Sequence, residues 1–427
     1  MGIGTFVNRS VKPVATPMRR SRASIGDLIM VAAVIALGLF GLLMLYSAST
    51  DFSLLTFKSP TFIFNKQLLW MAIGIVAAFV LSRIDYHIYR KFAIPLMVIT
   101  IVLLIAVLLN NEVRNNAVRA FFGGSVQPSE LAKLATVIYL SVWLYSKREY
   151  MHVIQLSLFP LAIILGVISG LIILEPDLSA AVTVFILGGL LFFLAGGELR
   201  QIILFCVVAL AVGWLVVRFS ATGQARLGPY LAGLKDPLKS SSHVLWSLDA
   251  VYKGSWFGVG IGNATTKLIG LPYSATDSIF AVIVEELGLF GALILIGLYG
   301  VLLWRGLAVA AKAPDMLGSV MAAGLTFWVV IEAAINMAVM VGLLPFAGNT
   351  LPFVSAGGSN LIATLAAIGI LLGISRQSGQ KAPFNRASAA GTGENNVRRS
   401  YSASVDLRRR DRRRGLPRAG RPASHPR

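Results

Sequence analysis

The sequence predicts an all-α polytopic membrane protein with about ten transmembrane helices. Of its 427 residues, 56% are hydrophobic and only 13% are charged, whereas a soluble protein of this length would need far more polar surface. The hydrophobic residues are gathered in long runs, each able to cross about 30 Å of hydrocarbon. Because a charge inside such a run is costly and rare, every charged side chain there is a candidate functional residue.

The apolar runs give the predicted crossings and the domain organisation. They lie at 27–48, 67–84, 91–109, 128–146, 153–174, 178–196, 199–219, 279–304, 316–341 and 359–375. An even number of crossings places both termini on one side, and the Lys and Arg residues of the flanks and short loops predict that this side is cytoplasmic. The predicted parts are a basic N-terminal segment (1–26), a transmembrane domain (27–375) and a basic tail (376–427).

The formal net charge of +19 is concentrated at the two ends of the chain. The tail, rich in Arg, Ser, Ala, Pro and Gly, has the composition of a disordered segment. We interpret both ends as cytoplasmic flanks held near anionic lipid, in preference to RNA or DNA binding, so no nucleic acid is expected as a partner. The single cysteine, Cys206, excludes an internal disulfide, and the lack of a Cys/His cluster argues against a zinc site.

A long outer segment, at about 220–277, separates the seventh and eighth crossings. Amphipathic pieces such as SSHVLWSLDAV predict short helices at the outer membrane face. Asp277 ends this segment and is expected to begin the eighth crossing. Two interpretations of Asp277 stay open: it is a helix N-cap, or it is a general base, because a carboxylate at the membrane–water boundary can accept a proton from a hydroxyl.

Two adjacent glutamates, Glu285 and Glu286, follow on the same crossing, about 12 Å deeper than Asp277. Adjacent side chains point about 100° apart on a helix, so at least one of the two should face the bundle. A structural role, as the partner of a cation or of exposed backbone, is favoured over catalysis.

A second set of polar residues lies on the fourth and ninth crossings. Glu130 and Lys133, in the run VQPSELAK, are spaced i,i+3 and share a helix face near its outer end. They either neutralise each other or line a polar cavity that receives an anionic head group, and the spacing does not decide between these. Glu332 and Asn336, spaced i,i+4, are expected to hydrogen-bond each other or a neighbouring helix.

Two outer turns complete the candidates. In EPDLSAA, Glu175 and Asp177 flank a proline, and Asp177 is expected to cap the sixth crossing. In the run 342–360, two Leu-Pro steps and a Gly-Gly pair predict a non-helical loop that could bind phosphate or sugar. The candidate residues of that loop are Ser355, Gly357, Gly358 and Ser359.

Taken together, these motifs resemble the SEDS family (shape, elongation, division and sporulation), the FtsW/RodA/SpoVE proteins, over about residues 27–376. The matching motifs are Gln127-Pro128-Ser129-Glu130 with Lys133, Glu175-Pro176-Asp177-Leu178, Gly258, Gly260 and Gly262, Leu271-Pro272, Thr276-Asp277, Ile279-Phe280-Ala281 with Glu285-Glu286-Leu287-Gly288, and Leu351-Pro352-Phe353 with Ser355 and Gly357-Gly358-Ser359.

The resemblance implies a peptidoglycan glycosyltransferase that polymerises lipid II and releases undecaprenyl pyrophosphate. It places the essential acid at Asp277, with Glu130 and Lys133 lining a central cavity. Positive charge for the leaving pyrophosphate would come from Lys133, Arg119, Arg226 or a divalent cation, Mg²⁺ or Mn²⁺. The implied partners are a class B penicillin-binding protein and other division proteins, at the septum of the bacterial cytoplasmic membrane.

Within the family, the run GVGIGNATTKLIGLP resembles the division type, FtsW, more than the elongation type, RodA. The chain departs from the common Pro-Glu-x-His-Thr-Asp pattern, because Tyr273 and Ala275 replace the Glu and the His, which puts the grip on substrate in doubt. The alternatives are an elongation-type polymerase, a lipid II flippase that needs no base at Asp277, and a non-catalytic scaffold. Turnover of lipid II separates a polymerase from the last two.

Overall fold

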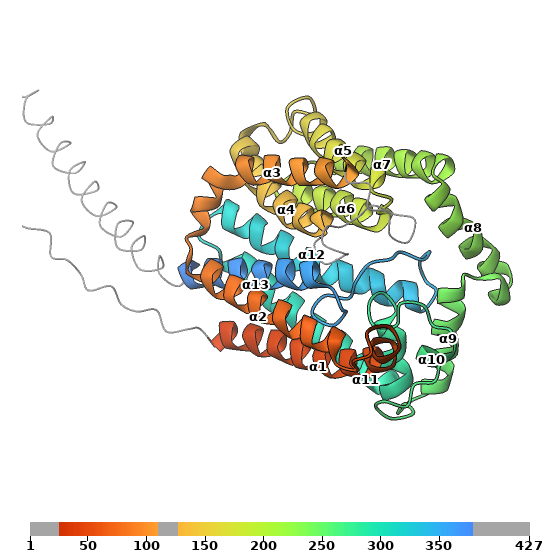
Figure 1. The fold of residues 1–427 in the computed structure, drawn as a ribbon. Coiled ribbons are helices and arrows are strands. Elements are labelled where there is room, and N and C mark those ends of the chain that lie inside the picture. Colours follow the sequence, from red (N-terminus) through yellow and green to blue (C-terminus); the bar gives the residue numbers. More distant parts are fainter. Residues whose placement is uncertain (1–24, 110–126, 379–427) are drawn as a thin grey trace, which may run out of the picture. The chain divides into compact units, whose positions relative to one another are not determined.

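The computed structural model describes residues 25–109 and 127–378, and these residues form helices and turns without a strand (Figure 1). The helices are α1 (Ile25–Phe57), α2 (Phe62–Arg83), α3 (Tyr89–Leu109), α4 (Pro128–Lys147), α5 (Leu158–Leu174), α6 (Leu178–Leu194), α7 (Leu199–Phe219), α8 (Ala221–Lys235), α9 (Ser242–Gly254), α10 (Thr266–Ile269), α11 (Ile279–Lys312), α12 (Met316–Met340) and α13 (Gly358–Ser378). The prediction of an all-α fold is confirmed.

Each predicted apolar run forms one long helix. Seven helices of the described part are long and apolar enough to cross a membrane, by length and composition. The helices α5 and α6 are apolar but shorter, and α4 carries the charged pair near its start. Pro128 occupies the first turn of α4, where its missing N–H removes no helical hydrogen bond. Helix α5 begins later than predicted, because residues 148–157 form a 3₁₀ turn and further turns.

Small residues allow the long helices to approach closely. Helix α13 packs along α2, while α11 packs against both α1 and α12. A Cβ added to Gly369 would lie 2.5 Å from the Ala78 carbonyl oxygen, and one added to Gly74 would lie 2.5 Å from the Leu365 side chain. Such contacts are typical of helix pairs in lipid, where tight packing replaces the hydrophobic drive between helices.

The predicted long segment between α7 and α11 folds as short helices at one end of the bundle, called here the loop end (Figure 1). Its residues 255–262 pack directly on the α11 backbone, where the amides of Val259 and Gly260 donate to the carbonyls of Glu285 and Glu286 at 2.9 and 3.0 Å. Gly288 has φ 69° at a kink in α11, a conformation that favours glycine. The candidate residues from four separate motifs meet at this loop end.

Candidate functional site

Asp277 lies in a turn that precedes α11, so the expectation that it caps or begins this helix is wrong. The amides of Thr276 and Ser278 both donate to the Tyr273 carbonyl, at 3.0 and 3.2 Å, and these turns continue the loop as far as Ser278. The residue at the N-cap position is Ser278, and its side chain makes no capping bond. Asp277 is partly exposed at the loop end.

Asp277 lies in the first of two loops that form the site, residues 271–278. The backbone of this loop is held by the second loop, residues 341–357, and by α12. Three consecutive carbonyls each accept one hydrogen bond: Ala275 from the Ala356 amide at 2.9 Å, Thr276 from the Ser355 hydroxyl at 2.6 Å, and Asp277 from Asn336 Nδ2 at 2.8 Å. Ser355, predicted as a ligand-binding hydroxyl, is therefore already engaged in joining the two loops.

Gly348 brings the second loop against the Asp277 carboxylate itself. A Cβ added to Gly348 would lie 3.0 Å from Asp277 Oδ2, closer than side chains normally pack. The sequence analysis did not single out Gly348, because a glycine in a loop of this composition carries little signal on its own.

Glu130 and Lys133 form a buried ion pair, and a third charged residue joins them. Lys133 Nζ lies 2.8 Å from Glu130 Oε2 and 2.5 Å from Glu332 Oε1 of α12. Asn360 Nδ2 of α13 donates to Glu130 Oε2 at 2.9 Å. The three charged side chains are at most 7% exposed, so one cation serves two carboxylates inside the bundle. Glu332 was visible in the sequence as a charge in an apolar run, but its partner was not.

Asp177 caps α6 as predicted and also joins α6 to α4. Its Oδ1 accepts from the Ala180 amide at 3.2 Å and from the Ser179 hydroxyl at 2.9 Å. Its Oδ2 accepts from Gln127 Nε2 at 2.9 Å. The backbone N–H of Gln127 donates to the hydroxyl of Ser359 at 2.9 Å. Glu175, in the same turn, is fully buried.

Gly358 and Ser359 belong to the first turn of α13, so the predicted non-helical loop ends earlier than expected. Gly357 is the last residue before the helix, and its amide donates to Gln67 Oε1 at 3.3 Å. A Cβ on Gly358 would lie 2.6 Å from Trp70 Nε1. The close approach of α2 therefore explains Gly358 without a ligand.

Glu285 and Glu286 are both fully buried, and both hold the outer segment to the bundle. Glu285 accepts from the Thr265 amide at 2.8 Å and also pairs with Thr266. Glu286 lies 2.9 Å from Lys267 Nζ and accepts from the Ser47 hydroxyl of α1 at 2.6 Å. These contacts join α1, α11 and the segment around α10 to one another.

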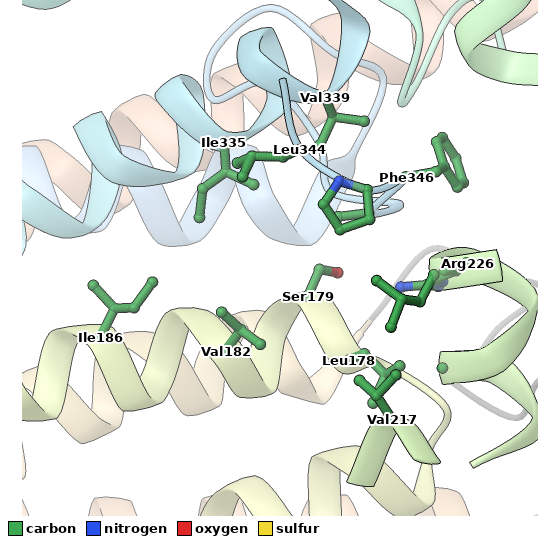
Figure 2. Close-up of a pocket in the computed structure, with 14 residues that line it drawn as sticks. Leu178, Ser179, Val182, Ile186, Val217, Arg226, Ile335, Val339, Leu344 and Phe346 are labelled. Atoms are coloured by element: carbon green, nitrogen blue, oxygen red, sulfur yellow. The ribbon is translucent and has the colours of Figure 1, made fainter. Parts of the chain in front are cut away.

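An apolar cavity of about 290 Å³ lies between α6 and α12 and is lined at one end by α8 and the second loop. Figure 2 shows Val182 and Ile186 facing Ile335 and Val339 across it, with Arg226 at its end. Arg226 also lines a smaller pocket of about 130 Å³, whose walls come from α8, α9 and the second loop. The cavity is thus almost wholly apolar, and Arg226 is the one charged residue among the described residues that line it.

His243, on α9, stacks on Phe346 with ring centroids 3.9 Å apart and lies parallel to Tyr273 at 5.9 Å. Burial and the positive charge of Arg226 lower the pKa of His243 to about 4. The neutral imidazole therefore acts as a packing surface that joins α9 to the two loops of the site.

Two predicted contributions to the site remain to be placed. Arg119 lies outside the described residues. In the described part, no three His, Cys, Asp or Glu side chains are grouped so as to hold a metal ion. Because Mg²⁺ is usually held by one or two carboxylates together with substrate phosphates, the divalent cation stays a prediction, and no step of the proposed reaction is assigned to it.

The fold and site define a polytopic membrane protein with a charged network buried among its helices and an acidic residue, Asp277, in a turn at the loop end. The sequence model of the FTSW_RODA_SPOVE family, described as cell cycle proteins, matches residues 27–380. The chain therefore belongs to the FtsW/RodA/SpoVE family, as the sequence motifs predicted.

Curated relatives match over most of their length. The chain is 35% identical over 353 residues to the probable peptidoglycan glycosyltransferase FtsW of Trichlorobacter lovleyi, covering 82% of this chain and 93% of that protein. It is 36% identical over 361 residues to stage V sporulation protein E of Bacillus subtilis, covering 82% and 97%.

Solved structures share the fold. A chain of a peptidoglycan synthase complex, described as coordinating polymerization and crosslinking, superposes with a TM-score of 0.67 at 27% identity, covering 84% of this chain and 99% of that one. The rod shape determining protein RodA of Thermus thermophilus superposes with a TM-score of 0.59 at 25% identity, covering 82% and 96%.

Proposed function

We propose that this protein is a peptidoglycan glycosyltransferase that polymerises lipid II into glycan strands during cell division. The family membership and the relatives named FtsW support this function. The observation that carries it in the structure is the placement of one partly exposed acidic residue, Asp277, whose backbone is hydrogen-bonded through Asn336 and Asn349 to α12, the helix that carries Glu332 of the buried charged network.

In the proposed reaction, Asp277 is the general base. It accepts the proton of the acceptor hydroxyl as the hydroxyl oxygen attacks C1 of the donor sugar. The bond between C1 and the pyrophosphate oxygen breaks, and undecaprenyl pyrophosphate leaves with that electron pair. The fixed carbonyls of 275–277 hold the base in place before the substrate arrives, which lowers the entropy cost of reaching the reacting geometry.

The leaving pyrophosphate needs positive charge, and the structure offers two cations near the site. Lys133 is fully engaged with Glu130 and Glu332, so its net effect on an anion is small. Arg226 lies at the end of the apolar cavity (Figure 2), where a prenyl chain and its charged head could bind together. We therefore assign the pyrophosphate to Arg226 rather than to Lys133, with Arg119 as a further contributor.

The proposed site of action is the cytoplasmic membrane at the division septum. A relative forms part of a peptidoglycan synthase complex, which supports a class B penicillin-binding protein as the partner that crosslinks the strands. Other division proteins are expected to recruit the pair.

The test is polymerisation of lipid II by the purified protein, with and without the penicillin-binding partner, with products resolved on a gel. Asp277→Asn should abolish strand formation, because the amide cannot accept the proton. Asp249→Asn is the matched control, since Asp249 lies in the same outer segment and, among the residues that the structure describes, its carboxylate pairs with the side chain of Lys253 at 2.8 Å. Absence of strands from the wild-type protein with every partner and cation would leave the flippase or scaffold function in place of the polymerase.

A further inference from the structure

Asn336 of α12 is a fully buried amide that contacts both loops of the site. Its Nδ2 donates to the Asp277 carbonyl at 2.8 Å and to the Asn349 carbonyl at 2.7 Å. One side chain thus uses both of its N–H groups on backbone, one in each loop. Of the two expected outcomes for Glu332, a bond to Asn336 or to a neighbouring helix, the structure shows the second, because Glu332 Oε1 accepts from Lys133 of α4.

Hydrogen bonds that are linked through the covalent bonds of Asn349 and Glu332 connect this amide to the buried ion pair. Asn349 Nδ2 donates to the Glu332 carbonyl at 3.0 Å, and Glu332 Oε1 accepts from Lys133 at 2.5 Å. The path therefore joins the Asp277 backbone to α4 through α12 and the second loop.

The other two bonds on the Asp277 segment do not provide this link. The donors to Ala275 and Thr276 are Ala356 and Ser355, which belong to the second loop. They join the two loops to each other, whereas Asn336 joins the Asp277 segment to a membrane helix. Loss of Asn336 would leave the loops paired, and the second loop bound to α12 through Asn349 and Glu332, but it would remove the direct bond from α12 to the Asp277 segment.

We propose that Asn336 is a positioning residue for the glycosyl transfer, which fixes the Asp277 carboxylate relative to the buried charges of α4 and α12. This inference rests on the proposed function. It assigns the residue no contact with substrate; its effect passes through the Asp277 backbone. Since a displacement of about 1 Å at a reacting group can cost about 10²-fold in rate, the effect should be large.

The experiment compares Asn336→Leu, which removes both donors without adding charge, with Gln67→Met. Gln67 of α2 is the matched control because it is also a buried amide bound to the second loop, donating to the Ser355 carbonyl at 3.0 Å, but it makes no bond to Asp277. With lipid II as substrate, Asn336→Leu should lower kcat about 10²-fold with little change in KM. Gln67→Met should retain most of kcat.

Two further measurements separate positioning from stability. Asn336→Gln, which keeps the N–H donors on a longer side chain, should recover part of kcat. Hydrogen exchange at 273–278 should accelerate in Asn336→Leu and stay unchanged in Gln67→Met, at equal melting temperatures. Wild-type kcat and unchanged exchange in Asn336→Leu would overturn the inference alone, whereas an inactive wild-type protein would overturn the proposed function beneath it.

Discussion

Replacement of Lys133 by methionine tests whether the buried cluster depends on its single cation. Lys133 is 2% exposed and is the cation that compensates Glu130 and Glu332, which are 7% and 1% exposed. Removal of one partner from a buried ion pair costs about 3–5 kcal/mol, because it leaves a charge in low dielectric without compensation. Here two carboxylates lose their partner, so we expect the cost of Lys133→Met to reach the upper part of that range.

Removal of one carboxylate should lower the free energy of unfolding much less than removal of Lys133. Glu332→Gln leaves the Glu130–Lys133 pair intact and neutral, and a triple variant (Lys133→Met, Glu130→Gln, Glu332→Gln) has no buried charge left in the cluster. Buried ion networks replaced as a whole are often neutral in stability. We therefore expect the triple variant to be more stable than Lys133→Met alone.

The assay is thermal unfolding in lipid nanodiscs. At roughly 2 °C of melting temperature per kcal/mol for a large chain, Lys133→Met should lower the midpoint by about 8–10 °C. Glu332→Gln should lower it by only a small part of that. Equal losses for Lys133→Met and Glu332→Gln, or a triple variant as unstable as the single one, would refute the electrostatic reasoning and indicate a packing role for the lysine stem.

Two other predictions concern the loop end. Gly348→Ala places a methyl group 3.0 Å from Asp277 Oδ2, so kcat should fall by about tenfold or more at an unchanged melting temperature. The control is Gly357→Ala, whose added Cβ would lie 3.5 Å from its nearest neighbouring atom and which should stay active. Equal activities of the two variants would contradict the prediction for Gly348. Because burial and Arg226 lower the pKa of His243 from 6.5 to about 4, the unfolded chain takes up the proton first as pH falls. The melting temperature should therefore drop between pH 6.5 and 4, and less so in His243→Phe; identical pH profiles would count against it.

The positions of the helices were predictable because each depends on a local property. A long apolar run must satisfy its backbone within one helix in lipid, so the predicted runs 128–146 and 199–219 lie within or coincide with α4 (128–147) and α7 (199–219). The Asp177 cap was predictable for a similar reason: a short polar side chain before an apolar run satisfies the first amides of a helix.

The partners across the site were not predictable, because no local rule relates residues far apart in the chain. Lys133 and Glu332 are 199 positions apart, and Ser47 and Glu286 are 239 apart. The same limit explains the error at Asp277. The acidic residue before an apolar run has the local pattern of a cap, but bonds from the second loop and α12 hold it in a turn instead.

The anchoring of Asp277 also explains how the site tolerates its departures from the common family pattern. Tyr273 and Ala275 replace the usual Glu and His, yet both positions hold the loop through their carbonyls: Tyr273 accepts from Thr276 and Ser278, and Ala275 accepts from Ala356. Any residue supplies a carbonyl, so these substitutions leave the position of the carboxylate intact. What they remove is polar side chains that could contact a substrate, so in the proposed function substrate binding depends on other groups, and we propose Arg226 as one of them.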